Sequence, residues 1–157
     1  MLKKPINILF VCTGNLCRSP LAEYLLRSRL KAGSSWEIGS AGLAAAEGLP
    51  ASQTAINVAA KIGVDLKPHH SRLLTREFID EAAIICAMTG AQVSEIKARF
   101  PKARDRVYLL GKFSRSMPGR EILDPIGGTP EIYQKTLEEI SDCLDRLIEY
   151  LKAYEKG

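Results

Sequence analysis

Residues 6–26 read INILFV-CTGNLCRSP-LAEYLL, and this stretch decides the fold. It begins with an apolar run typical of a buried β-strand and ends with a segment that favours a helix. Gly14 and Asn15 lie between the two and are the residue types that best tolerate a left-handed backbone. A strand, a tight loop and a helix in this order predict an α/β protein with a functional loop at the carboxyl end of its first strand.

The loop carries the groups that bind an oxyanion. Several of its N–H groups can turn inward to form a concave nest, and the following helix N-terminus adds donors and positive partial charge. Arg18 supplies a planar fork that holds two oxygens at once. Cys12 would lie beneath the anion, where the helix end and the arginine favour the nucleophilic thiolate. Ser19 can donate a hydrogen bond to that thiolate.

The rest of the chain alternates between strand and helix patterns. We expect further strands at 35–40, 82–88 and 106–110, and helices at 19–31, 51–62, 75–81 and 89–100. Ser19 is expected to cap the first of these helices and Thr75 the third. Thr129 and Pro130 begin a last helix, whose apolar residues recur every three or four positions and indicate core packing.

Alternating strands and helices joined by short loops imply a parallel sheet with right-handed crossovers. The predicted architecture is a single domain over residues 1–157, a small doubly wound four-stranded parallel sheet flanked by helices, with a phosphate loop after the first strand. Ligands of such sheets bind outside the carboxyl ends of the strands, which is where Cys12 lies.

The composition limits the classes of function. Of the 157 residues 46% are hydrophobic, which suits one domain with a sizeable core. The net charge of +4 is scattered and does not predict nucleic-acid binding. We expect no signal peptide and no membrane span, because the apolar runs are short. Four cysteines without a secretory context predict a cytoplasmic protein with reduced thiols, and we expect a monomer with no membrane partner.

The segment Cys12–Pro20 resembles the phosphate loop of the low-molecular-weight protein tyrosine phosphatases, and the likeness covers almost the whole chain. It differs from a nucleotide-binding P-loop, because no Gly-Lys-Ser/Thr follows. The resemblance implies that Cys12 is the nucleophile and Arg18 the phosphoryl-binding residue, with no metal or other cofactor. It also implies that the substrate is bound by the remaining loop residues Thr13, Gly14, Asn15, Leu16, Cys17 and Ser19.

Asp124 is the expected second catalytic group. It lies in the segment LDPIGG after the fourth predicted strand, where a loop can cover the carboxyl edge of the sheet. Pro125 stiffens this loop and biases Asp124 toward an extended backbone. The resemblance implies that Asp124 first protonates the leaving group and then activates the water that cleaves a phosphocysteine. The loop carboxylates Asp105 and Glu121 lack this context.

The resemblance also implies a set of residues that brace the phosphate loop, which here are Asn15, Ser40 and His69. His70 is expected to be an ordinary loop residue. In the resembled family the second loop cysteine, here Cys17, can form a reversible disulfide with the nucleophile, which would protect the thiolate from over-oxidation. The two remaining cysteines are expected in the core, namely Cys86 and Cys143.

We expect phosphotyrosine as the substrate class, with phosphoarginine as the alternative, and we favour neither an arsenate reductase nor a non-enzymatic binding module. Phosphorylated proteins are the expected partners, with phosphate and similar oxyanions as inhibitors. Leu16 favours phosphotyrosine, because an aliphatic side chain packs against a ring, whereas the resembled protein-arginine phosphatases have a threonine there. The short loop after Ser40 and the Asp-Pro-x-Gly-Gly pattern favour phosphoarginine instead. An arsenate reductase would need two cysteines close together downstream, and a non-enzymatic binding module would be expected to lack Cys12, Arg18 or Asp124.

Overall fold

The computed structural model describes residues 5–157 and contains one four-stranded parallel sheet in the order β2-β1-β3-β4. Its strands are β1 (Ile6–Cys12), β2 (Trp36–Gly42), β3 (Ile84–Ala87) and β4 (Val107–Leu109). The sheet and its order of elements confirm the fold class predicted from the sequence.

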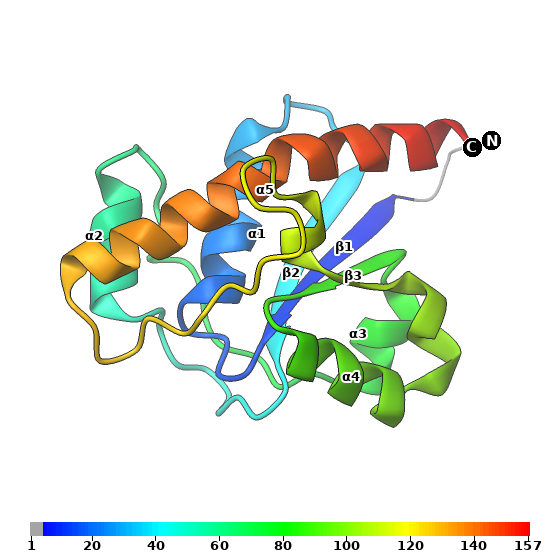
Figure 1. Cartoon of the computed structure of the whole chain (residues 1–157), viewed down its shortest axis with the longest axis horizontal. Helices are drawn as coiled ribbons and strands as arrows, with labels where there is room; N and C mark the ends of the chain where they lie inside the picture. The colour runs from blue at the N-terminus through cyan, green and yellow to red at the C-terminus, as the bar shows by residue number, and fades with distance from the viewer. Residues whose placement is uncertain (1–4) are drawn as a thin grey trace.

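Helices cover both faces of the sheet, with α1 and α5 on one side and α3 and α4 on the other (Figure 1). The α-helices are α1 (Arg18–Arg29), α2 (Gln53–Ala60), α3 (Arg76–Glu81), α4 (Gly90–Arg99) and α5 (Pro130–Lys156). Two short 3₁₀-helices, η1 (Pro101–Arg106) and η2 (Leu110–Phe113), flank β4. None of the helices in the described range 5–157 combines the length and hydropathy needed to cross a membrane.

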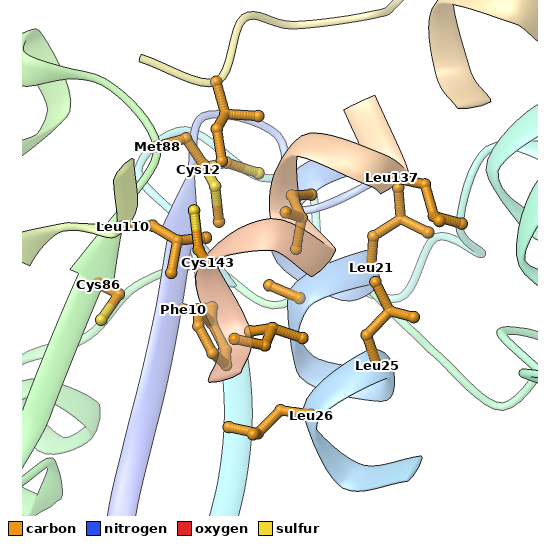
Figure 2. Packing of buried hydrophobic residues seen from close by; sticks show 14 of the residues in the cluster. Phe10, Cys12, Leu21, Leu25, Leu26, Cys86, Met88, Leu110, Leu137 and Cys143 are labelled. Carbon is orange, nitrogen blue, oxygen red and sulfur yellow. The ribbon is translucent and has the colours of Figure 1, made fainter. Parts of the chain in front are cut away.

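Side chains alternate along β1 because successive residues of a strand point to opposite faces. Ile8, Phe10 and Cys12 join the larger core beneath α1 and α5, whereas Leu9 and Val11 join the smaller core beneath α3 and α4. Figure 2 shows the larger core, in which Phe10 and Cys12 lie among residues of α1 and α5 that include Leu21, Leu25, Leu26, Leu137 and Cys143. The nucleophile predicted from the sequence is therefore anchored in packed core.

The strand order creates a switch point at β1. The chain passes from β1 to β2 on one side and then crosses to β3 on the other side. The connections therefore diverge at the carboxyl end of β1, where doubly wound sheets bind their ligands. Cys12 is the last residue of β1 and pairs with Gly42, the last residue of β2.

The predicted cap at Ser19 is wrong. α1 begins one residue earlier, at Arg18, and its N-cap Cys17 makes no side-chain capping bond. The hydroxyl of Ser19 instead faces the side chains of Cys12 and Asn15. Side-chain caps are present at four other helices, formed by Ser52, Thr75, Thr89 and Thr129.

Candidate active site

The loop between β1 and α1 has its carbonyl groups turned outward. The carbonyl oxygens of Cys12 and Thr13 accept hydrogen bonds from the N–H groups of Leu43 and Ala44, each at 2.9 Å. The carbonyl oxygens of the next part of the loop are held by His69 Nε2, at 2.7 Å from Asn15, and by Ser52 N, at 2.9 Å from Leu16. In a trans peptide the N–H points away from the carbonyl, so the following N–H groups face the concave side of the loop. This arrangement is an oxyanion nest.

Asn15 makes the tight turn that this nest requires. Its φ of 58° is the only positive φ of a non-glycine residue within residues 5–157. Its side-chain amide is held at both ends, since Oδ1 accepts the backbone N–H of Arg72 at 2.9 Å. Nδ2 donates to the hydroxyls of Ser19 at 2.8 Å and Ser40 at 3.0 Å. The polar side chains therefore stabilise a backbone conformation that is otherwise unfavourable.

A hydroxyl and a backbone N–H lie next to the Cys12 sulfur. Ser19 Oγ already accepts from Asn15, and it lies 3.0 Å from Cys12 Sγ. The hydroxyl of Ser19 is therefore close enough to donate to Cys12, the role that the sequence predicts for it. The backbone N–H of Asn15 points at the same sulfur, at 3.3 Å. The sulfur at the base of the nest thus lies within hydrogen-bond distance of two polar groups.

The predicted brace residues Ser40 and His69 are both buried against the loop. Because a carbonyl only accepts, His69 Nε2 must carry the hydrogen in its bond to Asn15. Burial lowers the pKa of His69, so the ring is neutral at the ordinary pH of cells. Ser40 donates in turn to Glu23 Oε1 at 2.6 Å, and Glu23 Oε2 pairs with Arg27 at 2.7 Å.

Arg18 is the first residue of α1, and only 5% of its side chain is exposed. Its Nη1 donates to the carbonyl of Ile122 at 3.0 Å, which fixes the plane of the guanidinium. Its Nη2 lies 3.7 Å from Asp124 Oδ2. The structure therefore brings together Arg18 and Asp124, which are 106 residues apart in the chain, the difference between 124 and 18.

Asp124 lies in the segment between η2 and α5, which runs across the ends of the central strands toward α5 (Figure 1). Its Oδ1 accepts the backbone N–H of Ile126 at 3.1 Å, which closes a local turn. Its side chain is 44% exposed, so a carboxylate is accessible to water on one side and close to Arg18 on the other. A group in this position can exchange protons with both a leaving oxygen and a water molecule.

A profile of the family described as low molecular weight phosphotyrosine protein phosphatase matches residues 7–156. The chain belongs to this family. Over 148 residues it is 42% identical to a protein-arginine-phosphatase of Geobacillus stearothermophilus, covering 94% of this chain and 97% of that protein. It is 36% identical over 147 residues to the probable low molecular weight protein-tyrosine-phosphatase EpsP of Ralstonia nicotianae, covering 94% and 97%. The structure of the YwlE arginine phosphatase from G. stearothermophilus superposes with a TM-score of 0.86 at 41% identity, covering 96% of each chain.

The other predicted site residues of this phosphatase chain lie in or next to the loop. Thr13 is exposed, whereas Gly14 and Leu16 are half-buried. The Leu16 side chain packs partly against the larger core. Cys17 is buried, with its sulfur 3.3 Å from Ser52 Oγ and 3.7 Å from Tyr133 Oη.

The other three thiols of this phosphatase have a raised pKa. Burial raises the pKa of Cys17, and it raises the pKa of both Cys86 and Cys143 to about 12. All four cysteines are free in the structure. Cys17, Cys86 and Cys143 are therefore thiols near neutral pH. Cys12 is the candidate nucleophile because its sulfur lies at the base of the nest.

Sequence reasoning missed three contacts to the site. Glu23 holds Ser40, Gln92 donates to the hydroxyl of Thr13 at 3.1 Å, and the carbonyl of Ile122 holds Arg18. Gln92 had a partial signal, because Thr89-x-x-Gln92 is a capping-box pattern. Within residues 5–157 no cluster of His, Cys, Asp and Glu has the arrangement of a metal site.

Proposed function

We propose that residues 1–157 form one catalytic domain of a phosphoprotein phosphatase that acts through a phosphocysteine on Cys12 and prefers phosphotyrosine. The observation that carries the proposal is the oxyanion nest of residues 12–17, with its carbonyls bonded outward and the Cys12 sulfur at its base. Such a nest stabilises the equatorial oxygens of a phosphoryl group during transfer.

In the first step the Cys12 thiolate attacks the phosphorus in line, and the bond from phosphorus to the ester oxygen breaks. Asp124, protonated, gives its hydrogen to the leaving oxygen. The inward N–H groups and the guanidinium of Arg18 hold the phosphoryl oxygens. No atom of this step needs a metal or another cofactor.

In the second step water attacks the phosphocysteine. Asp124, now a carboxylate, takes a proton from that water, the S–P bond breaks, and inorganic phosphate leaves. The sulfur departs with the electron pair, and the hydroxyl of Ser19, 3.0 Å away, donates a hydrogen bond to it. Phosphate and similar oxyanions are therefore expected to inhibit competitively.

Leu16 supports phosphotyrosine as the substrate class. Its half-buried aliphatic side chain offers a packing surface to a ring and no acceptor to a guanidinium. Phosphoarginine is the second candidate, favoured by the 42% identity to a relative named as a protein-arginine-phosphatase. The pattern Asp124-Pro-x-Gly-Gly also favoured this candidate in the sequence.

The test is hydrolysis of a phosphotyrosine peptide and a phosphoarginine peptide side by side, with a chelator present and Cys12→Ser as the inactive control. We expect a higher kcat/KM for phosphotyrosine. Leu16→Thr should shift the ratio of the two kcat/KM values toward phosphoarginine by roughly tenfold, since a well-placed polar partner is worth about 1.5 kcal/mol. A wild-type preference for phosphoarginine would replace the first candidate by the second.

The physiological partners in this proposal are phosphorylated proteins, and no nucleic acid or membrane takes part. We propose that the enzyme works in the cytoplasm as a monomer. All four cysteines are free, which supports a compartment that keeps thiols reduced.

A further inference from the structure

The amino end of α4 contacts the phosphate loop through Gln92. The Oε1 atom of this buried residue accepts the backbone N–H groups of Met88 at 3.0 Å and Thr89 at 3.1 Å. Since those groups can only donate, the opposite atom of the amide, Nε2, must face Thr13 Oγ1, at 3.1 Å. Thr13 accepts this bond and keeps its own hydrogen for a ligand at the exposed side of the loop.

The same helix end contacts the segment that leads into Asp124. The backbone N–H of Ile122 donates to the carbonyl of Met88 at 2.9 Å. One residue earlier, Glu121 Oε2 accepts the N–H of Gly90 at 2.6 Å. Gly90 is the first residue of α4, whose N–H has no partner inside the helix. A carboxylate is favourable there because of the helix dipole.

The acid loop around Asp124 has few apolar contacts on its exposed side. Leu123 is 68% exposed and Ile126 is 59% exposed, so these two side chains contribute little packing, whereas Pro125 next to Asp124 is buried. The carbonyl of Ile122 is bonded to Arg18 at 3.0 Å, which ties the start of the loop to the phosphate site. The bonds made at residues 121 and 122 therefore contribute to the position of Asp124, together with the buried Pro125 and the nearby Arg18.

We propose that Glu121 and Gln92 are positioning residues, which fix the acid loop and the phosphate loop to one helix end. Glu121 acts through the backbone of residues 121–124 on Asp124, and Gln92 acts through the hydroxyl of Thr13 on the bound phosphoryl group. Met88, fully buried in the same cluster as Cys12 (Figure 2), joins the two contacts. This inference rests on the proposed roles of Cys12 and Asp124.

The test for Glu121 compares phenyl phosphate, whose leaving group needs protonation, with p-nitrophenyl phosphate, whose leaving group does not. We expect Glu121→Ala to lower kcat/KM for phenyl phosphate roughly tenfold more than for p-nitrophenyl phosphate. This loss is smaller than the ~10²–10⁴-fold that a general acid supplies, because Asp124 is still present but less well positioned. Glu121→Gln keeps an acceptor for Gly90 and should lose less. Glu95→Gln, an exposed charge on the same helix paired only with Arg99, is the matched control.

The test for Gln92 is a double-mutant cycle with Thr13, read as the inhibition constant of inorganic phosphate. We expect Gln92→Ala and Thr13→Val each to weaken phosphate binding roughly threefold to tenfold, as for one lost hydrogen bond. The double variant should be no weaker than either single variant, because the two residues act through one contact.

Equal effects of Glu121→Ala on both esters, or additive effects in the cycle, would overturn the inference. Asp124→Ala separates this failure from a failure of the proposed function. If Asp124→Ala itself showed no dependence on the leaving group, the acid assignment would be wrong. Thermal unfolding of each variant confirms that it is folded before its kinetics are compared.

Discussion

At the scale of single residues, Asn15 has a left-handed backbone that costs most L-residues about 1–2 kcal/mol. Its carbonyl and its side-chain oxygen each accept a hydrogen bond, and its Nδ2 donates to two hydroxyls. Each net bond contributes about 0.5–1.5 kcal/mol, so the bonds together offset the strain. The turn is therefore kept in the resting protein, and the nest needs no rearrangement before phosphate binds.

Asp124→Ala tests the acid at this scale. Phenyl and alkyl phosphates should lose about 10²–10⁴-fold in kcat, because their leaving oxygen departs only when protonated. p-Nitrophenyl phosphate should lose far less in the first step. The measurement is steady-state hydrolysis of a series of esters at one pH, and equal losses across the series would contradict the role.

At the scale of elements, the carboxyl end of β2 supports the loop. A Cβ built on Gly42 would lie 2.6 Å from the carbonyl oxygen of Thr13 and 3.0 Å from the N of Asn15. Both atoms belong to backbone that cannot shift without opening the nest. Glycine is thus required at the end of β2, because the two backbones approach too closely to leave room for a Cβ atom.

Gly42→Ala should consequently damage both stability and binding. Overpacking of this kind costs about 1–3 kcal/mol, which lowers Tm by several degrees in a chain of this size. Phosphate inhibition should weaken as well. Gly39→Ala in the same strand is the control, because its Cβ would meet only the flexible tip of Arg72 at 3.0 Å. Unfolding scans and phosphate titrations measure both effects, and a Gly42→Ala protein that matches the control would contradict the packing argument.

Periodicity predicted the elements, because strands and helices with one buried face reveal themselves in local sequence. It did not predict the polar contacts between them. As a carboxylate in a helix pattern, Glu23 would be expected to face solvent. It is buried instead, because the hydroxyl of Ser40 on β2 donates to it and Arg27 forms an ion pair with it. The local sequence predicts Ser19 as a helix cap. In the folded chain its hydroxyl instead lies within hydrogen-bond distance of the side chains of Asn15 and Cys12.

At the scale of the whole molecule, the pKa values of two buried ionisable groups behind the loop are shifted in opposite directions. Burial lowers the pKa of His69 and raises that of Glu23. Both groups therefore favour their neutral forms in the folded state. The stability of the protein should depend on pH through both of them, with opposite signs.

His69 should make the protein less stable in mild acid. Between its lowered pKa and the ordinary value of 6.5, the unfolded chain binds the proton and the folded one does not. Its contribution is thus present above pH 6.5 and is lost as pH falls toward the folded pKa. His69→Gln should show a smaller fall in Tm between about pH 7 and about pH 5. An identical fall in Tm in both proteins would contradict this role of His69. The contribution of Glu23 to stability has the opposite sign and rises as the pH falls through its raised pKa.

The phosphoryl transfer to Cys12 is tested most directly by trapping it. Asp124→Ala, mixed with p-nitrophenyl phosphate, should be phosphorylated rapidly and hydrolysed slowly, because the water in the second step has lost its base. Rapid quenching followed by mass spectrometry should find one phosphoryl group, on the peptide that contains Cys12, and none in the Cys12→Ala, Asp124→Ala double variant. A phosphoryl group on another residue, or turnover without any phosphoenzyme, would contradict the account.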